Sequence, residues 1–240
     1  MNPLPAAPPD SVARALQDVA RLGPFFTVGL DAPDNGWHPV EDAYERGLAD
    51  LIARTAARYD TRELRIGASI VQLGHAARLW SPVLACTVLH GVIPDLTGLH
   101  RADDGPQLRL AAPAGWHAEP ATPPAQLAGV LYEAVMVRQL ERLRTGLRVK
   151  VAPGLLYGNA ASALAEAGRA ILAARPSAED RLSAVTGELL RTGNLAGTGS
   201  VTGSGLGFRR RSCCLYYRTP SGVTCGDCVF STAPPPRPDA

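Results

Sequence analysis

The chain has 240 residues, of which 46% are hydrophobic and 19% charged, and its formal net charge is +2 at pH 7. This length and apolar content predict a globular protein with a substantial core. A net charge so close to zero argues against the nucleic-acid-binding class, and no nucleic acid is expected as a partner. No apolar stretch reaches the roughly 20 residues that span a bilayer, and no secretory signal opens the chain. We therefore expect a cytoplasmic protein that is soluble or peripheral to the membrane.

Helical periodicity dominates the chain. Apolar residues recur at three- and four-residue spacing along most of its length, which predicts a mainly α fold. The helical ranges are 11–22, 40–59, 62–80, 82–92, 124–147, 155–174 and 178–190. The fifth range is the clearest, because Leu127, Leu131 and Leu140 lie on one face of it. Gly146 is placed to end this helix.

Strand is the minority state. Residues 25–30 favour a short strand, and residues 107–111 with residues 116–119 favour a hairpin. The expected fold class is therefore mainly α, or α+β with a minor hairpin component.

Composition divides the chain into a body and a C-terminal segment. A helical body is expected over residues 1–192, of which the Pro-rich residues 1–9 are expected to be frayed. Residues 193–207 are rich in glycine and lack apolar periodicity, which indicates a flexible tether or an ordered glycine loop. Residues 208–231 carry the cysteine-rich segment, and residues 232–240 form a Pro-rich tail.

The C-terminal segment holds Cys213, Cys214, Cys225 and Cys228, in the order Cys-Cys, ten residues, Cys, two residues, Cys. Residues 219–222, Thr-Pro-Ser-Gly, suit a type I turn with Pro second and Gly fourth. Such a turn folds the segment into a short hairpin that brings the two cysteine pairs opposite each other. The sequence therefore predicts a pocket with four thiolates.

Four thiolates suit either tetrahedral Zn²⁺ or an iron–sulfur cluster. Structural zinc sites usually pair cysteines two to four residues apart, whereas adjacent side chains of an extended segment point to opposite faces. The vicinal pair therefore favours a larger dinuclear core, although a bent backbone still allows zinc, and disulfides or unligated thiols stay open. The fifth cysteine, Cys86, lies in an apolar segment and is expected to be a buried small hydrophobe.

Basic residues surround the cysteines. Arg209, Arg210, Arg211 and Arg218 are placed to offset the charge of about −2 that an all-cysteinyl ferric [2Fe-2S] core carries. The alternative is that these arginines form a solvated basic tract or a docking patch for a partner.

At residues 208–230, the sequence FRRRSCCLYYRTPSGVTCGDCVF resembles the C-terminal cluster segment of the FhuF-like ferric-siderophore reductases. Softer similarity to that family extends over residues 65–94 and over the tract YGNAA at 157–161. The resemblance implies a cytoplasmic helical protein whose [2Fe-2S] cluster is ligated by the four cysteines of the segment. It implies one-electron reduction of Fe³⁺ held in a siderophore, with release of Fe²⁺ in the cytoplasm. It also implies an outside electron donor, such as a ferredoxin or a flavoprotein.

The same region of resemblance supplies candidates for contact with the siderophore. Arg65, Ser69, His75 and Arg78 lie on neighbouring turns of one predicted helix. The alternative is that this helix edge is packed within the fold. The other histidines have no metal-ligand spacing, and the basic side chains between 138 and 150 form a helix face that is solvated or receives an acidic donor.

Two other function classes compete with the reductase. One is a zinc-stapled binding module, in which the cysteine hairpin only fastens the C-terminus to the body. The other is an Fe–S redox sensor or electron carrier without a siderophore site. The sequence shows no dinucleotide-binding glycine fingerprint and no hydrolase nucleophile elbow, which agrees with chemistry that needs only an electron.

Overall fold

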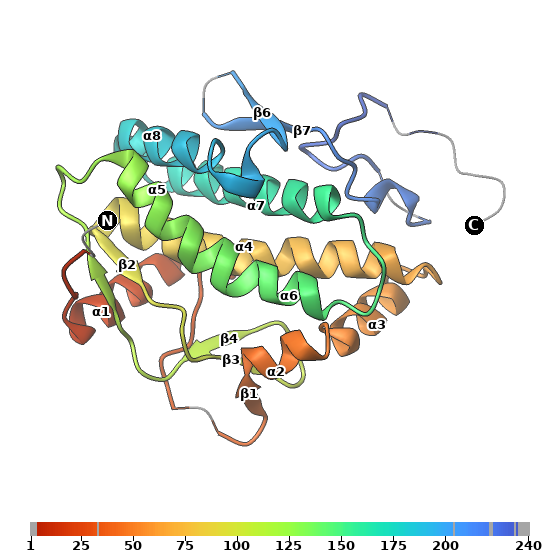
Figure 1. Ribbon diagram of the computed structural model, residues 1–240, viewed down its shortest axis with the longest axis horizontal. Coiled ribbons are helices and arrows are strands. Elements are labelled where there is room, and N and C mark those ends of the chain that lie inside the picture. Colours follow the sequence, from red (N-terminus) through yellow and green to blue (C-terminus); the bar gives the residue numbers. More distant parts are fainter. Residues whose placement is uncertain (1–3, 33, 204, 221–222, 233, 235–240) are drawn as a thin grey trace.

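The computed structural model describes residues 4–32, 34–203, 205–220, 223–232 and 234, and helices dominate over short strands among them (Figure 1). This confirms the mainly α fold class with a small β component. In the described part of the chain, no helix is both long and apolar enough to cross a membrane.

Two long helices form the centre of the fold, α4 (Leu64–His90) and α7 (Pro153–Ala174). They pack along each other and run in the same direction (Figure 1). Small side chains are common in both helices, and Ala68, Ala160 and Ala161 are completely buried. Small buried side chains let helix backbones approach closely, so the pair forms a dense platform for the segments around it.

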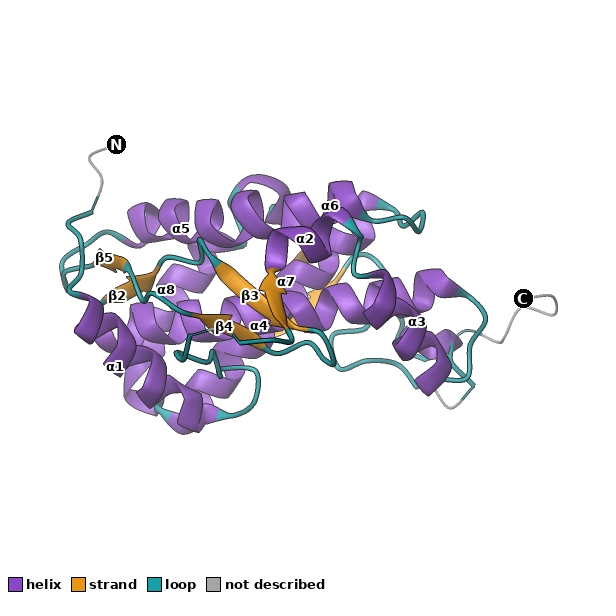
Figure 2. Ribbon diagram, turned by 90° about the horizontal axis from the view of Figure 1, so that it is seen from below, coloured by secondary structure: helices purple, strands orange, loops and turns teal. Residues whose placement is uncertain are grey.

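Shorter helices wrap this pair (Figure 2). They are α1 (Pro9–Val19), α2 (Val40–Glu45), α3 (Ala49–Arg58), α5 (Pro124–Tyr132), α6 (Glu141–Gly146) and α8 (Glu179–Leu189). A π-helical stretch, Glu133–Leu140, joins α5 to α6 without a break. The predicted range 124–147 is therefore one helical unit, and it ends at Gly146 as predicted.

Short strands in the described residues make three antiparallel sheets, ordered β1-β3-β4, β2-β5 and β6-β7. The strands are β1 (Trp37–Pro39), β2 (Val92–Pro94), β3 (Leu99–Ala102), β4 (Leu108–Leu110), β5 (Gly115–His117), β6 (Gly199–Thr202) and β7 (Gly207–Arg210). The three-stranded sheet lies beneath α4 in Figure 1, with Trp37 opposite Ala102 and His100 opposite Arg109.

The predicted strands are wrong in two places. β4 and β5 do not form the hairpin expected at 107–119, because β4 pairs with β3 and β5 pairs with β2. Residues 25–30 form no strand, although Phe26 and Val28 alternate into the core as strand residues would. Only Gly29 makes a bridge there, to Arg109, so the alternation reflects loop packing rather than a ladder.

Pro82 does not separate two helices, as the ranges 62–80 and 82–92 predicted, because α4 continues through it to His90. Proline inside a helix costs about 3 kcal/mol through a lost hydrogen bond and a steric clash. The next two residues, Val83 and Leu84, are completely buried. Burying two such side chains contributes about 3–6 kcal/mol, which outweighs that cost.

The single helix predicted over 40–59 is split into α2 and α3. The break lies at Gly47 and Leu48, whose φ angles are +64° and +53°. A Cβ on Gly47 would lie 2.5 Å from the carbonyl oxygen of Gly146, so the chain needs glycine where it approaches the end of α6.

The N-terminal residues 4–9, expected to be frayed, are fixed beside β5. Ala7 N–H donates to Gly115 O at 2.9 Å, and Pro5 O accepts a hydrogen bond from His117 N–H at 2.7 Å. Residues 1–3 lie outside the described part of the chain.

The glycine-rich range 193–207 contains regular structure in its described residues. It contains β6, which pairs with β7 so that Gly199 is opposite Arg210. Arg211 N–H also donates to Thr198 O at 2.8 Å. This hairpin connects the body directly to the cysteine segment that follows β7.

Candidate metal centre

The cysteine segment follows β7 and lies beside the N-terminal halves of α4 and α7 (Figure 1). Its only regular element among the described residues is a 3₁₀ turn, Tyr216–Arg218. The described residues between Cys213 and Cys228 form no strand, so no β-ladder joins the two cysteine pairs there. The predicted type I turn includes residues 221 and 222, which lie outside the described residues.

This loop brings the two halves of the cysteine motif together. The sulfur atoms of Cys214 and Cys225 lie 3.5 Å apart. Cys228 N–H donates to Cys225 O at 3.0 Å, which closes a tight turn over the Cys-Gly-Asp-Cys tetrapeptide. Cys214 is buried, while the other three cysteines are partly exposed.

Two of the sulfur atoms accept hydrogen bonds from the backbone. Leu215 N–H donates to Cys213 Sγ at 3.3 Å, and Phe230 N–H donates to Cys228 Sγ at 3.4 Å. Leu215 has a φ of +68°, a conformation that non-glycine residues seldom adopt. Hydrogen bonds of this type stabilise thiolate ligands and help to set the reduction potential of a cluster.

The contact between the thiols couples their acidities. Hydrogen bonds from Cys213 and Cys225 to Cys214 lower the pKa of the Cys214 thiol. The same hydrogen bonds, followed by burial, raise the pKa values of Cys213 and Cys225. Metal ligands must be thiolates, and hydrogen bonds from the neighbouring thiols favour the thiolate form of Cys214.

A buried polar contact fixes the cysteine segment to α4. Ser69 Oγ donates to Cys214 O at 2.7 Å. Asn159 Nδ2 donates to Ser69 O at 3.0 Å and to Ser69 Oγ at 3.2 Å, which ties α7 to the same point. The Cys214 backbone is therefore held by both central helices.

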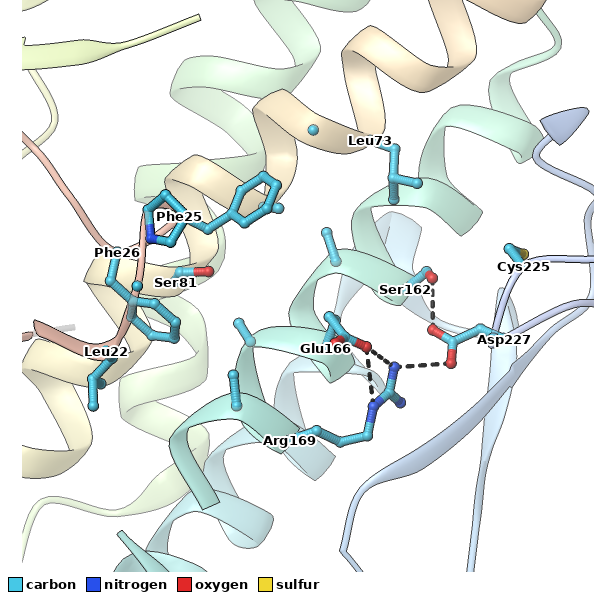
Figure 3. Close-up of a pocket in the computed structure, with 18 of the residues that line it drawn as sticks. Leu22, Phe25, Phe26, Leu73, Ser81, Ser162, Glu166, Arg169, Cys225 and Asp227 are labelled. Atoms are coloured by element: carbon cyan, nitrogen blue, oxygen red, sulfur yellow. Dashed lines mark hydrogen bonds and ion pairs between the residues drawn. The ribbon is translucent and has the colours of Figure 1, made fainter. Parts of the chain in front are cut away.

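Asp227 anchors the other half of the motif to α7 (Figure 3). Its carboxylate accepts a hydrogen bond from Ser162 Oγ at 2.7 Å and one from Arg169 Nη2 at 2.9 Å. The side chain of Asp227 is only 8% exposed, so these charge-assisted bonds are shielded from water. They fix the turn that carries Cys225 and Cys228.

Arg210 brings a buried positive charge beneath the cysteines. Its side chain is buried, and its Nη2 donates to Asn159 Oδ1 at 2.5 Å. Its Nε and Nη1 have no hydrogen-bond partner among the described residues. The charge of Arg210 also lowers the pKa values of Cys214 and Cys225, after the larger effects of hydrogen bonding and burial. A buried cation with free donors is suited to face an anionic group.

Aromatic side chains of the cysteine segment pack against the body and against each other. Tyr216 packs edge-to-face on Tyr59 of the chain that follows α3, and Tyr217 packs in the same way on Phe230. Arg218 forms an ion pair of 2.8 Å with Glu63, at the start of α4. Arg218 therefore closes the segment onto the body.

Two of the predicted substrate residues, Ser69 and His75, belong to the interior. Ser69 is completely buried and hydrogen-bonded to the chain, so it has no surface for a chelate. His75 lies 2.6 Å from the hydroxyl of Tyr44, which donates to Gln139 Oε1 at 2.9 Å. Burial lowers the pKa of His75 to about 3, so the imidazole is neutral. Both side chains are therefore packed within the fold.

The other two predicted substrate residues, Arg65 and Arg78, do not converge. Arg65 forms an ion pair with Glu63 and is about half exposed. Arg78 donates to Gly74 O at 3.0 Å, and its guanidinium lies 4.6 Å from the centre of the Phe25 ring. Only Arg78 is therefore near the cavity described next.

A partly open cavity of about 510 Å³ lies between α4, α7, the loop before β1 and the cysteine segment. Its walls are mostly apolar. Figure 3 shows Phe25 and Phe26 on one side and Cys225 and Asp227 on the other. Cys225 thus belongs both to the cysteine group and to the wall of the cavity.

Sequence reasoning missed four contributors to this site: Phe25, Ser162, Arg169 and Asp227. Asp227 carried a signal, because it lies inside the Cys-Gly-Asp-Cys turn. Ser162 and Arg169 lie on α7, seven residues apart, and no motif marks them. Phe25 reaches the site only through tertiary packing.

The remaining candidates lie apart from the cysteines. His38 and His90 pair with Asp103 and Asp18. On the basic helix face, carboxylates pair with Arg138, Arg142 and Arg144.

Cys86 is completely buried, as predicted, and burial raises the pKa of its thiol. Among the described residues, no three His, Cys, Asp or Glu side chains converge on the geometry of a single metal ion.

Residues 210–230 match the family model described as the FhuF 2Fe-2S C-terminal domain. No curated protein matches the chain. The donor set fits a dinuclear anionic cofactor, because the matched segment contains four thiols and backbone N–H groups that donate to sulfur. It also contains buried Arg210, whose Nε and Nη1 have no partner in the part of the chain that the structure describes. The match shows that this segment is similar to the FhuF 2Fe-2S C-terminal domain, and it supports a [2Fe-2S] cluster as the cofactor.

Proposed function

We propose that Cys213, Cys214, Cys225 and Cys228 ligate the [2Fe-2S] cluster, and that the protein is a ferric-siderophore reductase of the cytoplasm. One observation carries this proposal. The sulfur atom of Cys225 lies 3.5 Å from that of Cys214, and Cys225 also lines the cavity of about 510 Å³. A redox group held by these cysteines is thus next to a space of the size that small molecules occupy.

The chemistry requires only electron transfer. A [2Fe-2S] cluster supplies one electron at a time. Chelated Fe³⁺ gains that electron and becomes Fe²⁺, which hard oxygen ligands hold less tightly, and no covalent bond of the chelator breaks. An external donor, a reduced ferredoxin or flavoprotein, would have to supply a new electron to the cluster after each turnover.

The residues around the cysteines have three tasks in this proposal. Asp227 and Ser69 fix the two halves of the motif to the central helices. Buried Arg210 offsets the negative charge that thiolates and cluster carry together. Phe25 and Phe26 form the apolar wall of the cavity opposite Cys225.

The competing classes have less support. A zinc-stapled module does not agree with a match to a 2Fe-2S domain. A redox sensor or simple electron carrier has no need for a cavity beside one ligand, whereas a reductase needs a place for its substrate.

The test starts from protein purified without oxygen. We expect red-brown protein with two iron and two acid-labile sulfide per chain, since a [2Fe-2S] cluster contains these atoms. After chemical reduction and removal of excess reductant, a ferric siderophore should reoxidise it and deliver Fe²⁺ to a ferrous-specific trap. Cluster-containing protein that reduces no ferric chelate would contradict the reductase and favour the sensor.

A further inference from the structure

The cavity beside Cys225 has a composition that selects a particular kind of chelate. We propose that it receives an apolar arm of the ferric chelate, such as an acyl chain or an aromatic ring, while the iron centre stays at the rim near Cys225. This inference rests on the proposed reductase function and specifies its substrate class.

The apolar walls are the first support. Leu22, Phe25, Phe26, Ile70 and Leu73 line the cavity, and Phe25 is 41% exposed. An aromatic side chain left in contact with water gains free energy when an apolar group covers it. The iron centre of a chelate is surrounded by polar oxygen atoms and gains nothing from such walls, so the apolar arm is the part that fits.

The charges of the cavity are the second support. Its charged lining residues are Glu166, Arg169 and Asp227, and their formal sum is −1. Arg169 is already paired with both carboxylates. With the negative cluster nearby, this lining disfavours strongly anionic chelates and favours neutral ones.

The turn at Gly226 is the third support. Gly226 lines the cavity, and apart from its chain neighbours no atom of the described residues lies within 4 Å of the position that its Cβ would occupy. The backbone between Cys225 and Cys228 therefore borders open space. An iron centre at this rim would lie next to a cluster ligand without having to enter the apolar interior.

The test compares two chelates that differ only in the arm. Each is a linear tris(hydroxamate) chelator whose terminal amine carries either an acetyl or an octanoyl group, loaded with Ga³⁺ in place of Fe³⁺. Both complexes are neutral and redox-inert, so calorimetry measures binding without electron transfer. A buried CH₂ group contributes up to about fourfold in affinity, and we expect the octanoyl complex to bind cluster-containing protein at least tenfold more tightly.

Two variants locate the effect. Phe25→Ser removes an apolar wall, and Ala77→Phe fills the cavity from α4. Both should reduce the octanoyl-to-acetyl affinity ratio toward one. Their matched controls lie outside the cavity: Val137→Ser, at a residue also 41% exposed, and Ala57→Phe, at an exposed position of α3. The ratio should be unchanged in both controls.

Failure of this inference differs from failure of the proposed function. Equal affinity for the two gallium complexes in the unmodified protein, or a ratio that neither cavity variant changes, would overturn the apolar-arm proposal. Reduction of the Fe³⁺ form of the acetyl chelate by the unmodified protein would then still support the reductase. If no Fe³⁺ chelate is reduced, the proposed function fails whatever the gallium complexes show.

Discussion

The helical body and the cysteine segment are held in place by different forces. In the body, α4 and α7 bury long apolar surfaces, and completely buried residues such as Leu79, Trp80 and Leu164 are typical of this region. The cysteine segment has one short 3₁₀ turn and is held by polar contacts of Cys214, Asp227 and Arg210. Apolar burial tolerates many substitutions, whereas a few polar anchors do not. Single substitutions in the segment should therefore affect the cofactor more than the fold.

The largest effect is expected from the cysteines themselves. Cys214→Ser should abolish cluster binding and reductase activity, because the hydroxyl of serine is a poor substitute for a thiolate ligand. Iron and sulfide analysis of protein purified without oxygen measures the loss. The matched change in the body, Cys86→Ser, should keep the cluster and lower the free energy of unfolding by about 1–3 kcal/mol, since it buries a hydroxyl group. A full cluster in Cys214→Ser would refute the ligand assignment.

The next effect concerns the anchor of the second cysteine pair. Asp227→Asn keeps the shape of the side chain but removes the charge that holds Arg169. We expect the segment to be destabilised by about 1–3 kcal/mol. The rate at which an iron chelator bleaches the visible absorbance of the cluster should rise accordingly. Glu166→Gln, which changes the exposed partner of Arg169, serves as the control and should change that rate little. Equal bleaching rates in the two variants would rule out Asp227 as an anchor.

A pH experiment probes the body. Because His75 has a pKa of about 3 in the folded protein and an ordinary pKa of 6.5, the unfolded state binds more protons between these values. The contribution of neutral His75 to the free energy of unfolding is therefore fully present above pH 6.5 and is lost as the pH falls from 6.5 toward 3. The loss between pH 7 and pH 5 is about 2 kcal/mol. In His75→Gln this part of the pH dependence should disappear from denaturant unfolding curves. An unchanged slope would mean that folding does not lower the pKa of His75.

The smallest effect is expected on the reduction potential. Arg210→Met removes a buried positive charge next to Cys214 and Cys225, so the reduced, more negative cluster loses stabilisation and the potential falls. A charge interaction of about 1–2 kcal/mol corresponds to roughly 40–90 mV for one electron. A redox titration followed by visible absorbance measures it. Arg211→Met, at an exposed neighbour, should shift the potential much less because solvent screens its charge. A rise in potential for Arg210→Met would contradict the placement of its charge.

The difference between the helical body and the cysteine segment also explains which parts of the fold could be predicted from the sequence. The helical ranges 155–174 and 178–190 agree closely with α7 and α8, because apolar periodicity and burial act locally. The predicted helix boundaries are wrong at Pro82, where α4 continues, and at Gly47, where the chain breaks. Packing against other parts of the fold decides both outcomes, and local sequence does not show it.

The site was predictable only in part. The cysteine spacing indicated a four-thiolate group from the sequence, since the motif lies within one short segment. Ser69 and His75, which we predicted as substrate contacts, are buried in the interior. Their spacing along the helix could not show this, because spacing does not tell which side of a helix faces the core. The cavity joins Phe25, α4, α7 and Cys225, which lie far apart in the sequence, so no local pattern predicted it.

Single-turnover electron counting tests the central claim most directly. Protein with a chemically reduced cluster is mixed with a ferric siderophore and frozen at increasing times, and the paramagnetic signal of the reduced cluster is compared with trapped Fe²⁺. We expect the signal to disappear as Fe²⁺ forms, with one Fe²⁺ for each cluster oxidised. A signal that persists in the presence of the ferric siderophore, with no Fe²⁺ in the trap, would contradict the central claim.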